Sequence, residues 1–247
     1  MAKYLTEFNT YAEYQAATLN LPNVSLIKST GKVYYKNIYA GAVLGDILMY
    51  DVANQKLVAT LNAQWDSTTY PIASYEPIAI NVYPASATND GKGRWMALRW
   101  LDSTNNTGNK DATNMKWGLQ VSNTSTDQTA LNGRENTNII LNISGFETDY
   151  KIFEAANEFV TSGTSAGDWY VPSKGELSLY QSNYADINAK IETIKNASSS
   201  IVNTVNWNQW SSTENDNSNF AFNLDNNGSW NYHNKSNSYG VRGMIAL

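Results

Sequence analysis

The stretch GDWYVPSKGEL, residues 167–177, sets the local structure at the centre of the chain. Pro172 stands before Ser173, and Glu176 follows at the spacing of a capping box, in which free backbone N–H groups at a helix start are bonded reciprocally. A helix is therefore predicted to begin at Ser173 and to run to Tyr180. Apolar residues at helical spacing extend the pattern to about residue 196. These residues are Tyr184, Ile187, Ile191 and Ile194.

A second central helix is predicted over residues 146–160, because apolar residues recur there at the spacing of one helix face. They are Phe146, Tyr150, Phe153 and Ala156. Upstream, residues 102–138 are polar, and only residues 115–121 are apolar enough to pack. This upstream region is predicted to form loops laid over the surface.

Short runs rich in Ile, Val, Leu, Tyr and Trp flank the two helices and predict strands. They lie at residues 45–52, 56–61, 76–85, 94–101, 207–211, 220–224, 229–234 and 241–247. Asn227-Gly228 separates two of these runs and is the strongest short-range hairpin signal. The order of elements predicts an α+β domain whose first and last strands pair.

The N-terminal region predicts a small separate unit. Apolar spacing predicts a helix over residues 11–19, and the alternating runs 24–27 and 32–35 predict a hairpin. About 40 residues are too few to bury a core of their own. We therefore expect residues 1–43 to be an arm or attachment segment and residues 44–247 to be a ligand-binding domain.

Composition limits the chemistry of this chain. The 247 residues carry a formal net charge of −5, and no cluster of Lys and Arg is present to neutralise phosphates, so no nucleic-acid partner is expected. With no cysteine and one histidine, disulfides, thiolate catalysis, Cys-ligated zinc and multi-His metal sites are excluded. The sequence has neither a signal-peptide apolar region nor a run of about 18 apolar residues, which predicts no membrane insertion and no classical export signal.

The stretch NWNQWSSTENDNSNFAFNLDNNGSWNYHNKSNSY, residues 206–239, combines asparagine with aromatic residues and few charges. Antibody loops use this combination, because aromatic side chains supply contact area at low entropy cost while Asn and Ser supply adaptable hydrogen bonds. Strand alternation places Trp230, Tyr232 and Asn234 on one side and Asn231 and His233 on the other. We expect Trp230 to point inward, and Asn231 and His233 outward. A solvated hairpin without a function is the alternative.

Other candidate sites have weaker support. As a catalytic base, His233 would need a partner nucleophile and a third group to complete a triad, and the sequence indicates neither. No G-x-S-x-G motif occurs, so a surface or ligand-contacting histidine is expected. The oxygens of residues 225–227 leave calcium binding open. Gly91 and Gly93 lack the strand and helix of a phosphate loop and predict a turn.

Three motifs resemble those of one family: GDWYVPSKGEL, WSSTE (residues 210–214) and YGVRGMIAL (residues 239–247). The family comprises C-type-lectin-fold proteins of gut bacteria and their phages that serve as variable proteins of diversity-generating retroelements. The resemblance covers roughly residues 45–247. It departs at Gln209, where an aromatic residue is expected, and at Gly243, where proline is commoner. The leader at residues 21–35 is similar to those of phage structural proteins.

The resemblance implies a C-type lectin fold with mixed short strands, two central helices and a C-terminal variable hairpin. It also implies diversification by a reverse transcriptase that miscopies adenines. Asn codons begin with two adenines, and their products include Tyr, Ser, Asp, His and Phe, whereas Trp, Lys and Glu cannot arise by changing those two positions. Trp210, Glu214, Trp230 and Lys235 are therefore expected to be scaffold, together with Ser211, Ser212 and Thr213 of the WSSTE motif.

The resemblance bears on metal and redox chemistry as well. Many animal C-type lectins bind sugars through calcium, but this chain lacks their Glu-Pro-Asn type of triplet, and no metal ligand is assigned. The fold is also similar to that of formylglycine-generating enzymes, whose active-site cysteines are absent here.

We therefore expect a ligand- or receptor-binding protein, not an enzyme, displayed on a virion or a bacterial cell surface. No cofactor is expected, the partner would be a cell-surface protein or glycan, and residues 1–43 would serve a homo-oligomer or virion partner. The alternatives are a C-type-lectin-fold structural or cell-surface protein without diversification and, last, a hydrolase. The expected variable contacts, in the region of about 206–240, are Asn206, Asn208, Asn215, Asn217, Asn219, Phe220, Asn231, Tyr232, His233, Asn234, Tyr239 and Gly240.

Overall fold

The computed structural model describes residues 42–60, 65–99, 101, 115–198, 208–225 and 228–247, together with the backbone of four strands nearer the N-terminus. These four strands form one sheet in chain order: β1 (Leu5–Phe8), β2 (Val24–Ile27), β3 (Lys32–Tyr35) and β4 (Ile38–Tyr39). The antiparallel pairing of β2 with β3 confirms the predicted hairpin, whereas the parallel pairing of β1 with β2 was not predicted. The helix predicted over 11–19 lies outside the described residues.

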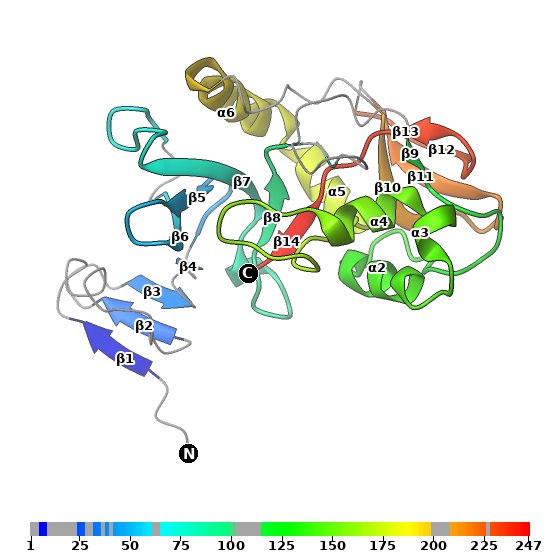
Figure 1. Cartoon of the computed structure of the whole chain (residues 1–247), viewed down its shortest axis with the longest axis horizontal. Helices are drawn as coiled ribbons and strands as arrows, with labels where there is room; N and C mark the ends of the chain where they lie inside the picture. The colour runs from blue at the N-terminus through cyan, green and yellow to red at the C-terminus, as the bar shows by residue number, and fades with distance from the viewer. Residues whose placement is uncertain are drawn as a thin grey trace.

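A five-stranded antiparallel sheet forms the centre of the rest of the chain (Figure 1). Its order is β14 (Met244–Ala246), β8 (Arg94–Ala97), β7 (Tyr75–Tyr83), β5 (Ile47–Asp51) and β6 (Lys56–Ala59). The last strand joins the early strands as predicted, but its partner is β8 and not the first strand of the sheet. Register shifts within the β5–β7 and β7–β8 pairs mark irregularities that bend such sheets.

Five helices occur in the described residues, where two long ones were expected. They are α2 (Gly133–Leu141), α3 (Phe146–Asp149), α4 (Lys151–Glu158), α5 (Lys174–Ser182) and α6 (Tyr184–Ala197), and a 3₁₀ turn covers Ala85–Ala87. The helix predicted over residues 146–160 breaks at Tyr150, which leaves helical geometry (φ −125°, ψ 63°) while its buried ring packs edge-on against Trp117 and Phe153. The helix predicted to begin at Ser173 breaks at Asn183.

The capping box predicted at the start of α5 is present. Ser173 Oγ accepts a hydrogen bond from the Glu176 backbone N–H (3.2 Å), and Glu176 Oε2 accepts one from the Ser173 backbone N–H (2.9 Å). The other carboxylate oxygen, Oε1, accepts from Arg94 Nε and from the Tyr170 hydroxyl, both at 2.9 Å. Glu176 therefore both caps the start of α5 and bonds α5 to Arg94 on β8.

Helix α2 corrects the expectation that residues 102–138 form only loops. Two of the residues on its buried face, Asn136 and Thr137, are polar. Asn136 Nδ2 donates to Ser212 Oγ (3.1 Å), and Thr137 Oγ1 accepts from the backbone N–H of Val171 (3.0 Å). Hydrogen bonding replaces apolar packing here, and the apolar pattern did not reveal the helix.

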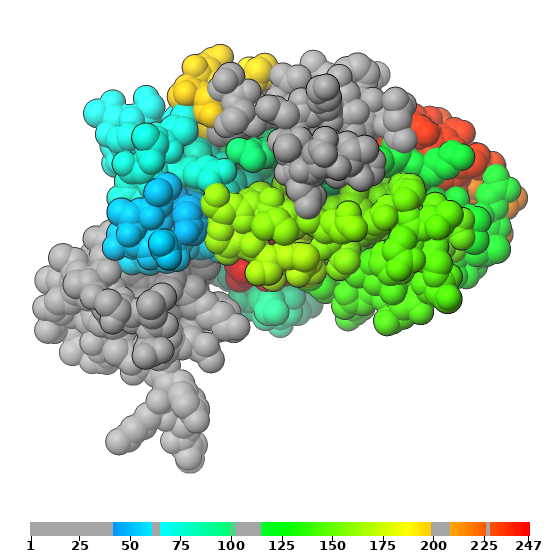
Figure 2. Space-filling model, viewed as in Figure 1, coloured from blue at the N-terminus to red at the C-terminus, as the bar shows by residue number. Residues whose placement is uncertain are grey.

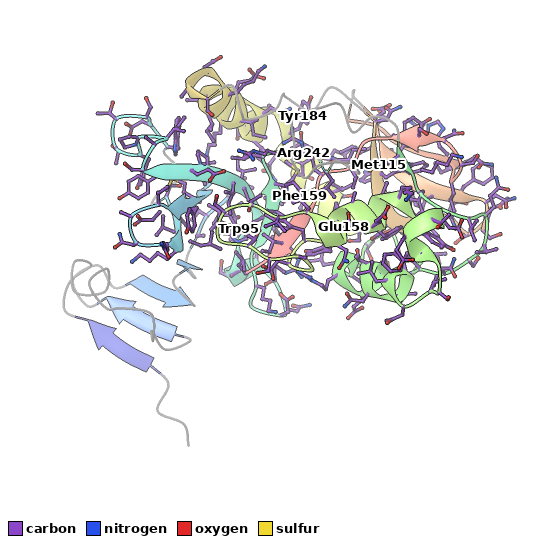
Figure 3. The ribbon with its side chains drawn as sticks, in the orientation of Figure 1. Trp95, Met115, Glu158, Phe159, Tyr184 and Arg242 are labelled. Carbon is purple, nitrogen blue, oxygen red and sulfur yellow. The ribbon has the colours of Figure 1, made fainter. Side chains whose placement is uncertain are left out.

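One cluster of buried side chains joins the sheet to the helices. Figure 3 marks Trp95 and Phe159 within it, and the Phe159 ring packs edge-on against Trp169 with 5.3 Å between centroids. Arg242, also fully buried, donates to the backbone carbonyl of Ala97 (3.2 Å), and burial lowers its pKa to about 10. The fold is thus α+β, as predicted.

Candidate functional site

The candidate site is built on a second, three-stranded sheet at the end of the molecule far from β1–β4 (Figure 1). Its strands are β10 (Gln209–Glu214), β11 (Phe220–Leu224) and β12 (Trp230–Asn234), all antiparallel, with β12 at the edge. Nearby, β9 (Met115–Lys116) pairs with β13 (Ser238–Tyr239). The β11–β12 pairing confirms the hairpin predicted at Asn227-Gly228.

Strand β10, which contains the WSSTE motif, is buried along its whole length. The indole N–H of Trp210 donates to the backbone carbonyl of Met115 (3.1 Å), and that of Trp117 donates to the carbonyl of Ser211 (2.8 Å). Ser211 Oγ in turn donates to the carbonyl of Phe222 (3.0 Å). These bonds tie β10 to segments on both sides, so its side chains are inaccessible to a ligand.

A buried ion pair links the end of β10 to the segment after β12. Lys235 Nζ lies 3.0 Å from Glu214 Oε1, and both side chains are 0% exposed. Glu214 Oε1 also accepts from the backbone N–H groups of Asn123 (2.9 Å) and Thr124 (3.0 Å). Lys235 Nζ lies 4.4 Å from the centre of the Trp117 ring. Burial lowers the pKa of Lys235, and the Glu214 carboxylate partly offsets this effect.

The register of β11 with β12 assigns the exposed side chains to two faces. Because paired residues share a face, one face carries Phe220, Phe222, Leu224, Trp230, Tyr232 and Asn234. The opposite face carries Ala221, Asn223, Asn231 and His233. The predicted alternation is therefore observed along β12.

The expected direction of the two faces is only partly correct. Tyr232, on the Trp230 side, is 57% exposed, whereas His233, expected to point outward, is half-buried with its ring 5.0 Å from that of Tyr239. The Tyr239 ring also packs edge-on against Trp210 at 5.0 Å. The strand lies at the edge of a small sheet, so neither face is wholly covered.

Two asparagines in the turn between β10 and β11 have a structural function. Asn215 Oδ1 accepts from the backbone N–H of Asn217 (3.2 Å), and Asn217 Oδ1 accepts from that of Asn219 (3.0 Å). Such local bonds explain why asparagine is favoured in tight turns. Part of the asparagine content of this stretch therefore reflects turn geometry.

The structure places the predicted contacts in three environments. Three are exposed: Asn217, Asn231 and Tyr232. Seven are half-buried: Asn208, Asn215, Asn219, Phe220, His233, Asn234 and Tyr239. Gly240 is buried, and the expectation that it is exposed was wrong, because its backbone N–H and C=O bond to Asn208 and Trp210. Asn206 lies outside the described residues.

Sequence reasoning missed a segment that borders this surface, the loop after β9. Gln120 Nε2 donates to Asn234 Oδ1 (2.7 Å), and Leu119 and Val121 on either side are 44% and 47% exposed. In Figure 2, green atoms of this part of the chain lie beside the red C-terminal segment. The run 115–121 was recognised as able to pack, but no local pattern predicts which distant strand it meets.

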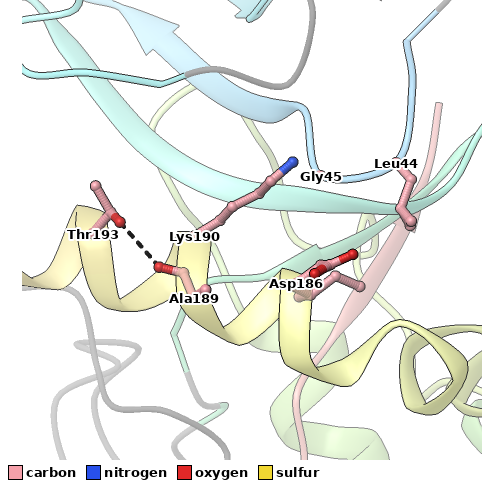
Figure 4. Close-up of a pocket in the computed structure, with 7 residues that line it drawn as sticks. Leu44, Gly45, Asp186, Ala189, Lys190 and Thr193 are labelled. Atoms are coloured by element: carbon pink, nitrogen blue, oxygen red, sulfur yellow. Dashed lines mark hydrogen bonds between the residues drawn. The ribbon is translucent and has the colours of Figure 1, made fainter.

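The described residues hold no group of three or more His, Asp or Glu side chains that could bind a metal ion. A cavity of about 320 Å³ lies elsewhere, between α6 and the segment leading into β5 (Figure 4). Lys190 crosses it toward Gly45, and Asp186 and Thr193 lie along the same helix. None of its lining residues belongs to the candidate site.

Comparison with known proteins finds a similar fold among solved structures. No protein-family model and no curated protein matches the chain. A fimbrial protein from Bacteroides ovatus has a similar solved structure, with a TM-score of 0.53 and 17% sequence identity. The match covers 83% of this chain and 49% of the fimbrial protein, so this chain spans about half of that protein's length. At this identity the likeness shows the fold alone. No helix in the described part of the chain is long and apolar enough to span a membrane.

Proposed function

We propose that this chain is a ligand- or receptor-binding protein of the C-type lectin fold whose C-terminal surface is diversified by adenine-directed mutagenesis. It would be displayed on a virion or a bacterial cell, with binding and not catalysis as its activity. Residues 44–247 would carry the ligand, and residues 1–43 would attach the domain to a larger assembly or to further copies of itself.

One observation carries the proposal, the separation of residue types by burial within the C-terminal sheet. Trp210, Glu214 and Lys235, which Asn-codon mutagenesis cannot produce, are fully buried and hold the scaffold together. Tyr232 and Asn231, which it can produce, are exposed on β12, at the other edge of the same sheet. A segment that must fold reliably and vary freely needs this division.

The division also explains how variation would leave the fold intact. Substitutions at exposed positions away from special contacts usually change stability by about 0.5 kcal/mol or less. The bonds of Trp210, Trp117 and Glu214 do not involve the exposed side chains of β12. Many surfaces could therefore be presented on one scaffold, and multivalent display would raise the avidity of a weak single site.

The gene sequence tests diversification directly. We expect a near-identical repeat of the C-terminal coding region close to the gene, differing from it only where the repeat has adenine, beside a reverse-transcriptase gene. The codon for Tyr232 should differ between the two copies, with an Asn codon at that position in the repeat. The codons for the exposed asparagines should keep the two adenines of the repeat, and those for Trp210 and Lys235 should be unchanged. If no such repeat exists, or if the differences fall on the buried residues, the diversification proposal fails.

Binding is tested with purified protein and intact gut bacteria. A variant with Asn217, Asn231 and Tyr232 all changed to Ala should lose cell binding. The matched control is Asn138→Ala with Ile139→Ala, two exposed positions on α2 outside the candidate sheet. Equal binding by the triple variant and the control, with both variants folded, would refute the site.

A non-diversified surface or structural protein is the second candidate. It is favoured by the similarity of the fold to that of a fimbrial protein. The two candidates predict different gene neighbourhoods, so the repeat search separates them without a binding assay. In the second case no repeat of the C-terminal coding region exists, and the asparagines only form turns and keep the surface of the sheet polar.

A further inference from the structure

The exposed ring of Tyr232 is held in a fixed orientation. Its centroid lies 5.7 Å from that of Phe220 and 6.4 Å from that of Phe222, with interplanar angles of 83° and 81°. Behind these rings, Lys174 Nζ lies 4.2 Å from the centre of Phe222 and 5.2 Å from that of Trp230. We call Tyr232, Phe220 and Phe222 the stacking platform. Its outermost ring is both accessible and preorganised.

Two amide side chains border the stacking platform. Asn234 lies two residues beyond Tyr232 on the same strand face and pairs with Phe220. Gln120 Nε2 donates to Asn234 Oδ1 (2.7 Å), and we call these two residues the amide rim. Within the described residues, the Asn234 amide nitrogen and the Gln120 amide oxygen make no other hydrogen bond. The N–H donors of the Asn234 amide and the Gln120 carbonyl acceptor therefore remain for a ligand.

The backbone on both sides of Gln120 is fixed to the scaffold. The N–H groups of Trp117 and Gly118 donate to the carbonyl of Lys235 (3.0 and 3.3 Å), and Lys235 Nζ donates to the carbonyl of Val121 (2.7 Å). Gln120 lies outside the region 206–240 that is proposed to vary. Gln120 is thus expected to stay constant, whereas its partner Asn234 lies in the region proposed to vary.

We infer that the stacking platform and the amide rim form a subsite for a neutral pyranose sugar, bound without calcium; this inference rests on the proposed function. An exposed aromatic ring can stack on the apolar C–H face of a pyranose. A hydroxyl group both donates and accepts hydrogen bonds, and the free donor and acceptor of the amide rim match it. Neither the platform nor the rim carries a charge, which fits a neutral ligand.

The same observations disfavour a folded protein as the ligand of this subsite. Specific protein interfaces bury about 800 Å² on each partner and depend on clusters of aromatic and Arg anchors. The subsite itself consists of one exposed ring flanked by amides, a combination sized for a single sugar unit, with the exposed side chains of Leu119 and Val121 on either side of Gln120. Calcium is not required, because the ring and the two amides supply the contacts themselves.

The test measures binding of the full chain to an immobilised panel of neutral hexose and N-acetylhexosamine oligosaccharides in the presence of EDTA. At least one oligosaccharide should bind. Tyr232→Ala should weaken that binding by about ten-fold or more, since it removes the stacking surface. Tyr232→Phe keeps the ring and should retain binding. Gln120→Ala should weaken it by several-fold, and Asn138→Ala on α2 should not.

Three results would overturn the inference. No neutral oligosaccharide binds although intact bacteria do; EDTA abolishes sugar binding; or Tyr232→Ala and Tyr232→Phe lose it equally. If bacteria bind through Tyr232 and the binding survives periodate oxidation of their glycans, the ligand is a protein. That outcome rejects the sugar subsite and leaves the proposed function standing. Failure to bind any cell or sugar rejects both.

Discussion

Glu214 and Lys235 form the ion pair with the least exposed side chains among the described residues, and their geometry accounts for their retention in the core. Removing two charges from water is costly, and the cost is recovered only where further hydrogen bonds complete the site. The backbone N–H groups of Asn123 and Thr124 and the carbonyl of Val121 supply bonds of this kind, all of those to Glu214 through Oε1, while Glu214 Oε2 is buried with no hydrogen-bond partner among the described residues. The pair thus fixes the loop after β9 to the C-terminal sheet.

Replacing Lys235 with Met should lower the free energy of unfolding by about 3–5 kcal/mol, because it leaves Glu214 buried without its cation. Chemical denaturation of the purified variant measures the change. The control is Lys195→Met, whose partner Glu192 is about one-third exposed, and this variant should lose at most about 1 kcal/mol. Equal losses in the two variants would contradict the assigned role of Lys235.

The asparagines of the C-terminal stretch should differ in their tolerance of substitution. Asn217→Tyr removes the acceptor for the Asn219 backbone N–H in the turn, and should cost about 1 kcal/mol of stability. Asn231→Tyr removes only a solvent-exposed bond, from Asn231 Nδ2 to Asp225 Oδ2 (3.1 Å), and should cost about 0.5 kcal/mol or less. Thermal unfolding of the two variants compares them. No loss of stability in Asn217→Tyr would mean that the turn does not depend on the Asn217 side chain.

At the scale of elements, α2 and the start of α5 meet with no space between them. A Cβ atom on Gly133 would lie 2.6 Å from the Ser173 backbone nitrogen and 2.7 Å from the Val171 carbonyl oxygen, and would also meet Glu176 Oε2. These atoms belong to the capping box and to the backbone leading into it. They cannot move without breaking the hydrogen bonds that begin α5.

Gly133→Ala should therefore destabilise the protein by about 1–3 kcal/mol, the range for overpacking in a close-packed interior. Asn138→Ala on the exposed side of α2 is the matched control, and it should be neutral or slightly stabilising because alanine favours helices. Denaturant titration of both variants measures the difference. If Gly133→Ala is as stable as the control, α2 and α5 are not packed as closely as described.

The elements that the sequence predicts well are those with a local chemical cause. Ser173 and Glu176 set the start of α5, and the Asn-Gly signal at 227–228 correctly predicted that β11 and β12 pair. Helix α2 was missed because Asn136 and Thr137, on its buried face, are held by hydrogen bonds and not by apolar packing. Periodicity of apolar residues cannot report a helix that packs through polar groups.

The candidate site was predicted less completely, because its assembly depends on contacts distant in sequence. Alternation along β12 could be predicted, but not which face is exposed, since Tyr239 covers His233 from outside the strand. Gln120 reaches Asn234 through the β9–β13 pairing, which has no local signal. Gly240 is buried because its backbone bonds to Trp210 of β10 and to Asn208 just before that strand, and its residue type does not reveal these bonds.

At the scale of the whole molecule, several buried tyrosines link stability to alkaline pH. Burial raises the pKa of Tyr150, Tyr170 and Tyr180 above the ordinary value near 10. Above pH 10 the unfolded chain therefore releases protons that the folded chain retains, and the free energy of unfolding falls as pH rises. Arg242, with its pKa lowered to about 10, acts in the opposite direction, as do the other cations whose pKa burial lowers, Lys56, Arg134, Lys174 and Lys235. The tyrosines decide the direction, because the pKa of Tyr170 lies well above 10 and that of Tyr180 is strongly raised as well.

Stability should thus be lost between about pH 10 and pH 12, with unfolding coupled to tyrosine ionisation. Denaturant titrations at stepped pH, followed by tyrosinate absorbance, measure both changes together. Tyr180→Phe should show a shallower decline, because one of the linked groups is gone, although its bond to Asn188 is lost as well. A stability that stays constant or rises across this pH range would contradict the linkage.

The pairing of β14 with β8 has a consequence for the chain between them. The α2–α6 helices and the whole candidate surface lie in the covalent loop that this pairing closes. The entropy lost on closing a loop depends on its length and only weakly on which residues it contains. A change of side chain within the loop leaves that term untouched, whereas an insertion alters it only logarithmically. The loop-closure penalty of this pairing is thereby set by topology, independently of the sequence displayed on β12.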